Sequence, residues 1–80
     1  MKQAEVLAQL QEVFDGIFLE KVEARPELSA RDVEEWDSLM QISLVIAVEQ
    51  RFRVRFRIGE VESARTLGEF ADLIAKRMEP

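Results

Sequence analysis

The chain offers few side chains that could carry out chemistry. Its 80 residues include no cysteine and no histidine, which excludes thiolate nucleophiles, Cys/His zinc sites, Ser-His-Asp triads and imidazole acid–base catalysis. No glycine-rich phosphate-binding loop occurs, so nucleotide binding has no support. Glu34, Glu35 and Asp37 are close in sequence and could hold a divalent ion. A solvated acidic loop is the more probable interpretation, and we predict no metal site.

Ser38 is the residue with the strongest case for chemistry. It follows Asp37 at the predicted start of a helix, between the apolar residues Trp36 and Leu39. A helix N-terminus stabilises negative charge, because free N–H groups and the helix dipole both point at it. A phosphodiester on the Ser38 hydroxyl would be stabilised there, within reach of an enzyme. From spacing alone, a serine that only caps its helix is the commoner case, so both roles remain open.

Four segments show helical or capping patterns. Apolar residues at three- and four-residue steps predict helices over 2–20 and 38–52. Residues 60–64 can form at most a short helix, and a Thr66-x-x-Glu69 capping box opens a last helix that reaches Met78. Asp37 or Ser38 can cap the second helix, and Ser38-x-x-Gln41 also fits a capping box.

The connection over 21–37 is long for so small a domain. Pro26 stops any helix there, and Ser29–Asp32 resembles a capping box that starts one short turn. We therefore predict an all-α fold with one domain over 1–80: a small four-helix bundle with three longer helices, one short helix and a long first loop.

The second predicted helix is apolar on nearly every side, so it must leave an apolar face for another molecule or be covered by several neighbours. Some residues of this helix, together with two later residues, could line a groove that shelters a short apolar chain, although we expect most of them to pack the core. The candidate groove residues are Leu44, Ile46 and Val48 of the helix, with Val61 and Leu67.

Charge is unevenly distributed along the chain. Residues 1–50 carry a net charge of −7, residues 51–58 carry four arginines and no acid, and residues 59–80 carry −2. The alternation of arginine and apolar residues over 51–58 resembles a strand, but no second strand could pair with it. We predict an extended loop in which Phe56 and Ile58 point inward while the arginines stay in solvent.

The composition favours a soluble cytoplasmic protein. Apolar residues make up 48% of the chain and charged residues 34%, and the net charge of −5 argues against a general nucleic-acid binder. No apolar run approaches the roughly 20 residues needed to cross a bilayer, and the first residues lack the apolar core of a signal peptide. We predict a monomer without membrane contact.

The segment 35–40, Glu-Trp-Asp-Ser-Leu-Met, followed by the helical pattern up to Phe52, resembles the Asp-Ser-Leu motif and second helix of acyl carrier proteins. The similarity continues through 60–64 and Thr66-Leu67 into the last helix. The first helix and the long loop match in length and pattern, so the resemblance covers nearly the whole chain.

This resemblance implies a carrier that is not an enzyme. A phosphopantetheinyl transferase would move 4'-phosphopantetheine from coenzyme A onto Ser38, within the motif that includes Asp37 and Leu39. The terminal thiol would then hold acyl, hydroxyacyl or aminoacyl groups as thioesters for acyl-loading and acyl-processing enzymes. The absence of cysteine from the chain is consistent with a thiol supplied by the cofactor.

The chain departs from carriers of fatty acid synthesis at the positions that dock partners. Aspartate and glutamate are common after the motif where Met40 and Ser43 stand here, and a normally acidic loop carries arginines. Lost acidic charges weaken docking on basic enzyme surfaces, so we predict dedicated partners in a specialised pathway. The predicted partner-binding residues are Met40, Ser43, Glu49, Arg53, Arg55 and Arg57.

An alternative from another class is an unmodified helical module. Ser38 would then be only a cap, and the arginines with Phe52 and Phe56 would form a protein- or nucleic-acid-binding strip. Basic residues interleaved with aromatic ones can bind single strands, although the acidic net charge opposes this.

Overall fold

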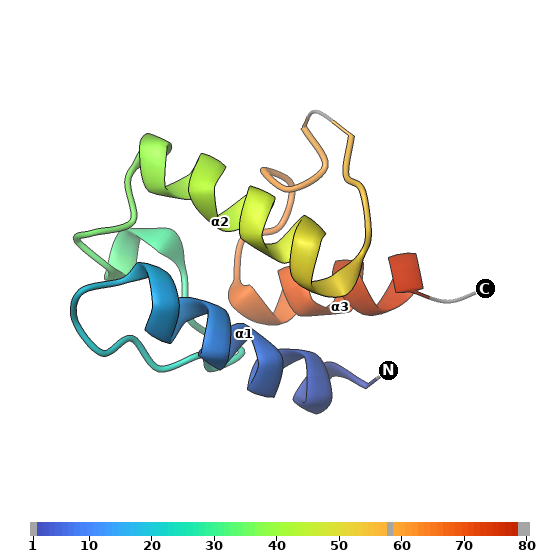
Figure 1. Cartoon of the computed structure of the whole chain (residues 1–80), viewed down its shortest axis with the longest axis horizontal. Helices are drawn as coiled ribbons and strands as arrows, with labels where there is room; N and C mark the ends of the chain where they lie inside the picture. Colours follow the sequence, from blue (N-terminus) through green and yellow to red (C-terminus); the bar gives the residue numbers. More distant parts are fainter. Residues whose placement is uncertain (1, 58, 79–80) are drawn as a thin grey trace.

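A computed structural model describes residues 2–57 and 59–78, and this part of the chain contains helices and no strand (Figure 1). The prediction of an all-α fold is confirmed. The elements are α1 (Gln3–Ile17), the single 3-10 turn η1 (Ala30–Asp32), α2 (Ser38–Phe52) and α3 (Leu67–Met78). The α2 and α3 helices both contact α1.

The predicted four-helix bundle is not confirmed. Residues 60–64 form consecutive turns, with Ser63 N–H donating to Glu60 O at 3.3 Å and Ala64 N–H to Val61 O at 3.1 Å. So few residues cannot offset the cost of nucleating an α-helix. The short helical turn lies instead in the first loop, at η1, where the pattern of Ser29 and Asp32 predicts it.

The first helix is shorter than the predicted 2–20. It ends at Ile17, and Phe18 is already extended, with φ −91° and ψ 139°. The Glu35 carboxylate accepts the next two N–H groups, from Leu19 at 3.0 Å and Glu20 at 2.9 Å. A distant side chain therefore replaces the helix carbonyls that those groups would otherwise need.

The core lies between the three helices and extends under the first loop. Leu10 and Phe14 of α1, Leu44 and Val48 of α2, and Ile74 of α3 have no exposed surface. The buried positions recur at helical steps, which confirms the inward faces that periodicity predicts on α1 and α3. On α2, Leu44 and Val48 face inward, whereas Leu39, Ile42 and Ile46 are exposed.

The first loop is attached to the start of α3. Leu67 N–H donates to Leu28 O at 2.7 Å, and Gly68 N–H donates to Pro26 O at 2.8 Å. The Thr66 hydroxyl accepts the N–H of Glu69 at 3.2 Å, so the predicted cap of the last helix is confirmed. The long connection is thereby held against α3 by backbone hydrogen bonds.

Gly68 is required where the loop approaches α3. A Cβ at Gly68 would lie 3.0 Å from Pro26 O, whereas a Cβ at Gly16 would meet nothing within 4 Å. We expect Gly68→Ala to destabilise the fold by about 1–2 kcal/mol through overpacking. Gly16→Ala should instead stabilise it by about 0.5–1 kcal/mol, because it restricts the unfolded chain. Thermal unfolding of both variants tests this pair, and a Gly68→Ala variant as stable as the parent would contradict it.

No helix in residues 2–57 and 59–78 is long and apolar enough to cross a membrane.

Candidate functional site

Ser38 is the first residue of α2 and is exposed. The cap of this helix is Asp37, whose carboxylate accepts the N–H of Met40 at 2.8 Å. Such a cap contributes about 1 kcal/mol. The interpretation of Ser38 as only a helix cap is therefore wrong, and its hydroxyl is available for another role.

The capping box predicted from Ser38 and Gln41 is also absent. The Gln41 side chain instead accepts a hydrogen bond from the indole N–H of Trp36 at 2.6 Å. This bond joins the first turn of α2 to the residue two positions before Ser38. It therefore helps to hold the backbone on which Ser38 stands.

Trp36, two residues before Ser38, packs its side chain against the core. Its ring meets Phe14 edge-on at a centroid distance of 5.6 Å and lies 5.8 Å from Phe18. Such aromatic pairs contribute about 0.5–1.5 kcal/mol each beyond their buried area. The segment leading to Ser38 is consequently fixed against the end of α1.

The electrostatics at Ser38 suit an anion. The N–H groups of Ser38 and Leu39 belong to the first turn of α2 and have no carbonyl partner within the helix. Together with the helix dipole they stabilise negative charge by about 0.3–1 kcal/mol when the site is exposed. Leu39 beside them is 74% exposed, so an apolar surface adjoins the polar one.

A cavity of about 80 Å³ lies near the start of α2. Trp36, Gln41, Val61 and Leu67 contribute to its lining, with Leu28 and Phe70. Two of the residues predicted to line a groove, Val61 and Leu67, are therefore present. The predicted groove residues Leu44 and Val48 are fully buried instead, because they face α1.

The outward side of α2 is apolar, as its composition predicts. Ile42 is 59% exposed and Ile46 is 51% exposed. Both line a concavity of about 310 Å³ between α2 and the following loop. Ser43 is exposed on the same helix, whereas Met40 is half-buried and packs against the core.

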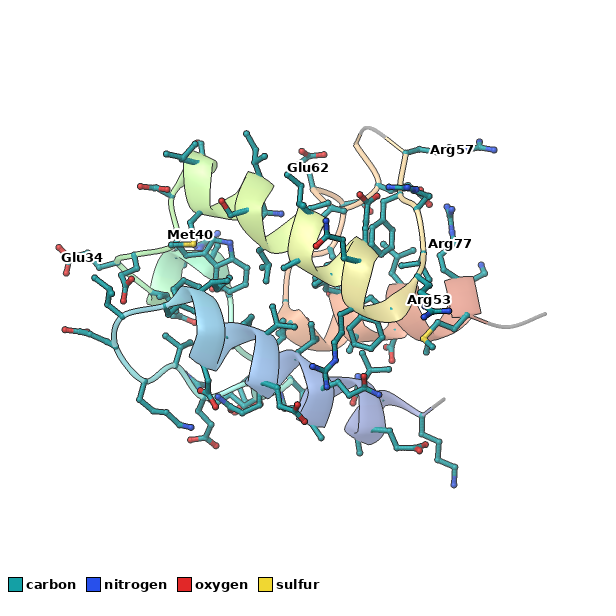
Figure 2. The ribbon with its side chains drawn as sticks, in the orientation of Figure 1. Glu34, Met40, Arg53, Arg57, Glu62 and Arg77 are labelled. Atoms are coloured by element: carbon teal, nitrogen blue, oxygen red, sulfur yellow. The ribbon has the colours of Figure 1, made fainter. Side chains whose placement is uncertain are left out.

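The predicted extended loop after α2 is present. Val54 is buried, and Phe56 packs against Phe70 with ring centroids 5.8 Å apart, while Arg53, Arg55 and Arg57 are exposed. The predicted inward position of Ile58 lies outside the described residues. Figure 2 shows Arg53 at the end of α2 that is remote from Met40, and Arg57 on the loop that follows.

Glu49 and Glu60 hold this loop. Glu49 accepts the N–H of Phe56 at 2.9 Å, and Glu60 accepts the N–H of Arg57 at 2.6 Å. The hydrogen bond from Arg57, with the charge of Arg77, lowers the pKa of Glu60 below its ordinary value of 4.5. Because the folded state lowers the pKa of Glu60, the ionised carboxylate stabilises the fold at pH values above the ordinary pKa. This contribution to stability is lost as the pH falls through the lowered pKa.

Sequence reasoning missed Glu35, Glu60 and Arg77. The Arg57–Glu60 spacing of three residues is a local signal of a cap-like hydrogen bond. Glu35 and Arg77 carry no comparable signal, because each contacts backbone 15 or more residues away.

The fold and the site define a small helical domain with an exposed serine in the first turn of a helix that another residue caps. Consistent with this, the chain is 32% identical over 76 residues to an acyl carrier protein of Acidothermus cellulolyticus, which covers 94% of this chain and 90% of that relative. The chain belongs to the acyl carrier protein family. No family model matches it, and no solved structure gives a significant match.

Proposed function

We propose that the protein carries acyl, hydroxyacyl or aminoacyl intermediates for partner enzymes and catalyses no reaction itself. The observation that carries this proposal is the exposed Ser38 at the start of α2, freed from capping by Asp37. The attached 4'-phosphopantetheine would supply the thiol that holds each intermediate as a thioester. Tethering raises the effective concentration of the cargo at each partner.

Three residues would serve the attachment directly. The Ser38 oxygen would form the phosphodiester, and its own N–H and that of Leu39 would face the phosphate charge. Asp37 holds the helix start through its hydrogen bond to Met40 N–H. A phosphopantetheinyl transferase is the partner that would make this bond.

We further propose that the carrier is a monomer that serves a specialised pathway in the cytoplasm.

The proposed partner-binding residues occupy both ends of α2. Met40 and Ser43 lie within two turns of Ser38, whereas Arg53, the first of the arginines, lies about 22 Å from Ser38 along the helix axis at the usual rise per residue. This set consists of Met40, Ser43, Glu49, Arg53, Arg55 and Arg57.

Intact mass spectrometry tests the carrier role. The purified protein is incubated with coenzyme A and a broad-specificity phosphopantetheinyl transferase, and its mass is compared with that of a sample without the transferase. We expect complete conversion to a species heavier by one phosphopantetheinyl group. A chain that remains unmodified, while a known carrier in the same tube is converted, would refute the proposal and favour an unmodified interaction module.

A further inference from the structure

The loop after α2 carries a concentrated positive surface on an otherwise acidic protein. This basic rim consists of Arg53, Arg55 and Arg57, which are exposed. Arg51 does not belong to it, because its guanidinium donates to Glu12 at 2.8 Å and is used to join α2 to α1. Within the described residues, Arg55 meets Glu49 only at 3.8 Å and is 90% exposed.

The backbone of the basic rim is held in place although its side chains are exposed. Glu49 and Glu60 accept the N–H groups of Phe56 and Arg57, and Arg77 donates to Arg55 O at 3.0 Å and to Glu60. Three charged side chains therefore fix this short segment. The rim is presented as an ordered surface rather than as a flexible tail, which lowers the entropy cost of binding a partner.

Arg53 has an unfavourable backbone conformation. Its φ of 58° and ψ of 46° lie in the left-handed region, at the helix end where glycine is the preferred residue. An arginine here costs stability that glycine would not. Since the Arg53 side chain makes no hydrogen bond or ion pair within the described residues that would offset this cost, the backbone outlier supports a role in binding.

An apolar concavity adjoins the basic rim. Ile42 and Ile46 of α2 line it from one side, and Phe56, Arg57 and Val61 line it from the loop. Glu62 also lines the concavity and lies apart from Arg57 (Figure 2). An apolar centre with a charged border is the usual anatomy of a protein–protein interface.

We infer that this surface docks an acidic face of a partner protein, with an apolar side chain entering the concavity and carboxylates meeting the basic rim. The inference rests on the proposed carrier function, because it assigns the chemistry of the partner enzymes. The charge of the rim selects carboxylates and repels the basic patches that bind acidic carriers. Glu49 acts here as a positioning residue, since its carboxylate already holds the loop.

A nucleic acid fits this surface less well than an acidic protein does. Stacking on bases needs exposed aromatic rings, but Phe52 is buried and Phe56 packs on Phe70.

NMR titration with designed peptides tests the inference. One helical peptide presents leucines flanked by glutamates, and a matched peptide replaces every glutamate by lysine. We expect the glutamate peptide to shift the amide signals of Ile42, Ile46 and the basic rim, with weaker binding as salt is raised. Binding of the lysine peptide with equal affinity would overturn the inference, as would stronger binding of oligothymidylate at the same amides or self-association of the chain there.

Arg53→Gly separates docking from folding. Glycine suits the left-handed conformation, so we expect Arg53→Gly to have an unchanged or higher melting temperature. The double variant Arg53→Gly/Arg55→Ala lacks two charges of the basic rim, and we expect it to bind the glutamate peptide about tenfold more weakly. Arg31→Ala, which removes one exposed charge from η1, should leave peptide binding unchanged. Unaltered binding by the double variant would contradict the inference.

The two proposals fail in distinguishable ways. Endpoint modification by the transferase is measured by intact mass in the same variants. If the parent chain does not bind the glutamate peptide but is completely modified at Ser38, the acidic partner is rejected and the carrier function stands. Peptide binding by a chain that cannot be modified rejects the carrier function.

Discussion

Replacing Ser38 by alanine is expected to abolish attachment of phosphopantetheine completely, while the fold is retained. The hydroxyl oxygen is the atom that would form the phosphodiester, so its removal leaves no acceptor at the start of α2. The helix itself should be unaffected, because Asp37 and not Ser38 supplies the cap. Intact mass after treatment with coenzyme A and transferase measures the result, and circular dichroism checks the helix content.

Ser63→Ala is the matched control for this variant. Ser63 is also exposed, but it lies in the turn before α3, where its hydroxyl donates to Glu60 O at 2.7 Å. This variant should gain one phosphopantetheinyl group as the parent does. A mass gain that persists in Ser38→Ala and disappears in Ser63→Ala would show that Ser38 is not the attachment point.

Phe14→Ala is expected to destabilise the domain severely. Phe14 has no exposed surface, and its ring contacts Phe18 and Trp36 at centroid distances of 5.2 and 5.6 Å. Truncation of a buried phenylalanine costs about 3–5 kcal/mol. A domain of this size has a total free energy of unfolding of roughly 4–12 kcal/mol, so the variant should lose a large share of its stability.

Urea unfolding followed by tryptophan emission measures this loss. Trp36 is the sole tryptophan of the chain and contacts Phe14 directly, so its emission should shift to longer wavelength in the variant. Leu19→Ala provides the control, because Leu19 lies two residues after the end of the same helix and is 96% exposed. Comparable stability of the two variants would show that the aromatic cluster contributes little to the fold.

Local sequence patterns predict the helices because each helix buries one periodic face. The structure contains the buried apolar face of α1, the Thr66 cap and the buried face of α3 from Leu67 to Ile74 at the positions that the sequence predicts. The end of α1 could not be predicted in this way. Glu35 terminates the helix at Ile17 from 15 or more positions away, and no pattern near residue 17 contains that information.

The candidate site could be predicted in part. Asp37, Ser38 and Leu39 were identified from their motif, but the sequence left both Asp37 and Ser38 as possible caps. Only the geometry assigns the cap to Asp37 and turns Gln41 toward Trp36. Glu49 was predicted to contact partners, yet the structure shows its carboxylate bonded to Phe56 N–H, so partner contact by Glu49 stays a prediction.

The sequence alone determined the helical class, the serine at a helix start and the charge contrast between the body and the arginine segment. These properties depend on residue type and on spacing within one or two turns, which the chain states directly. Tertiary structure decided which residue caps α2, where α1 stops and how the arginine loop is held. Those outcomes depend on bonds between residues far apart in the chain, whose geometry exists only after the helices have packed.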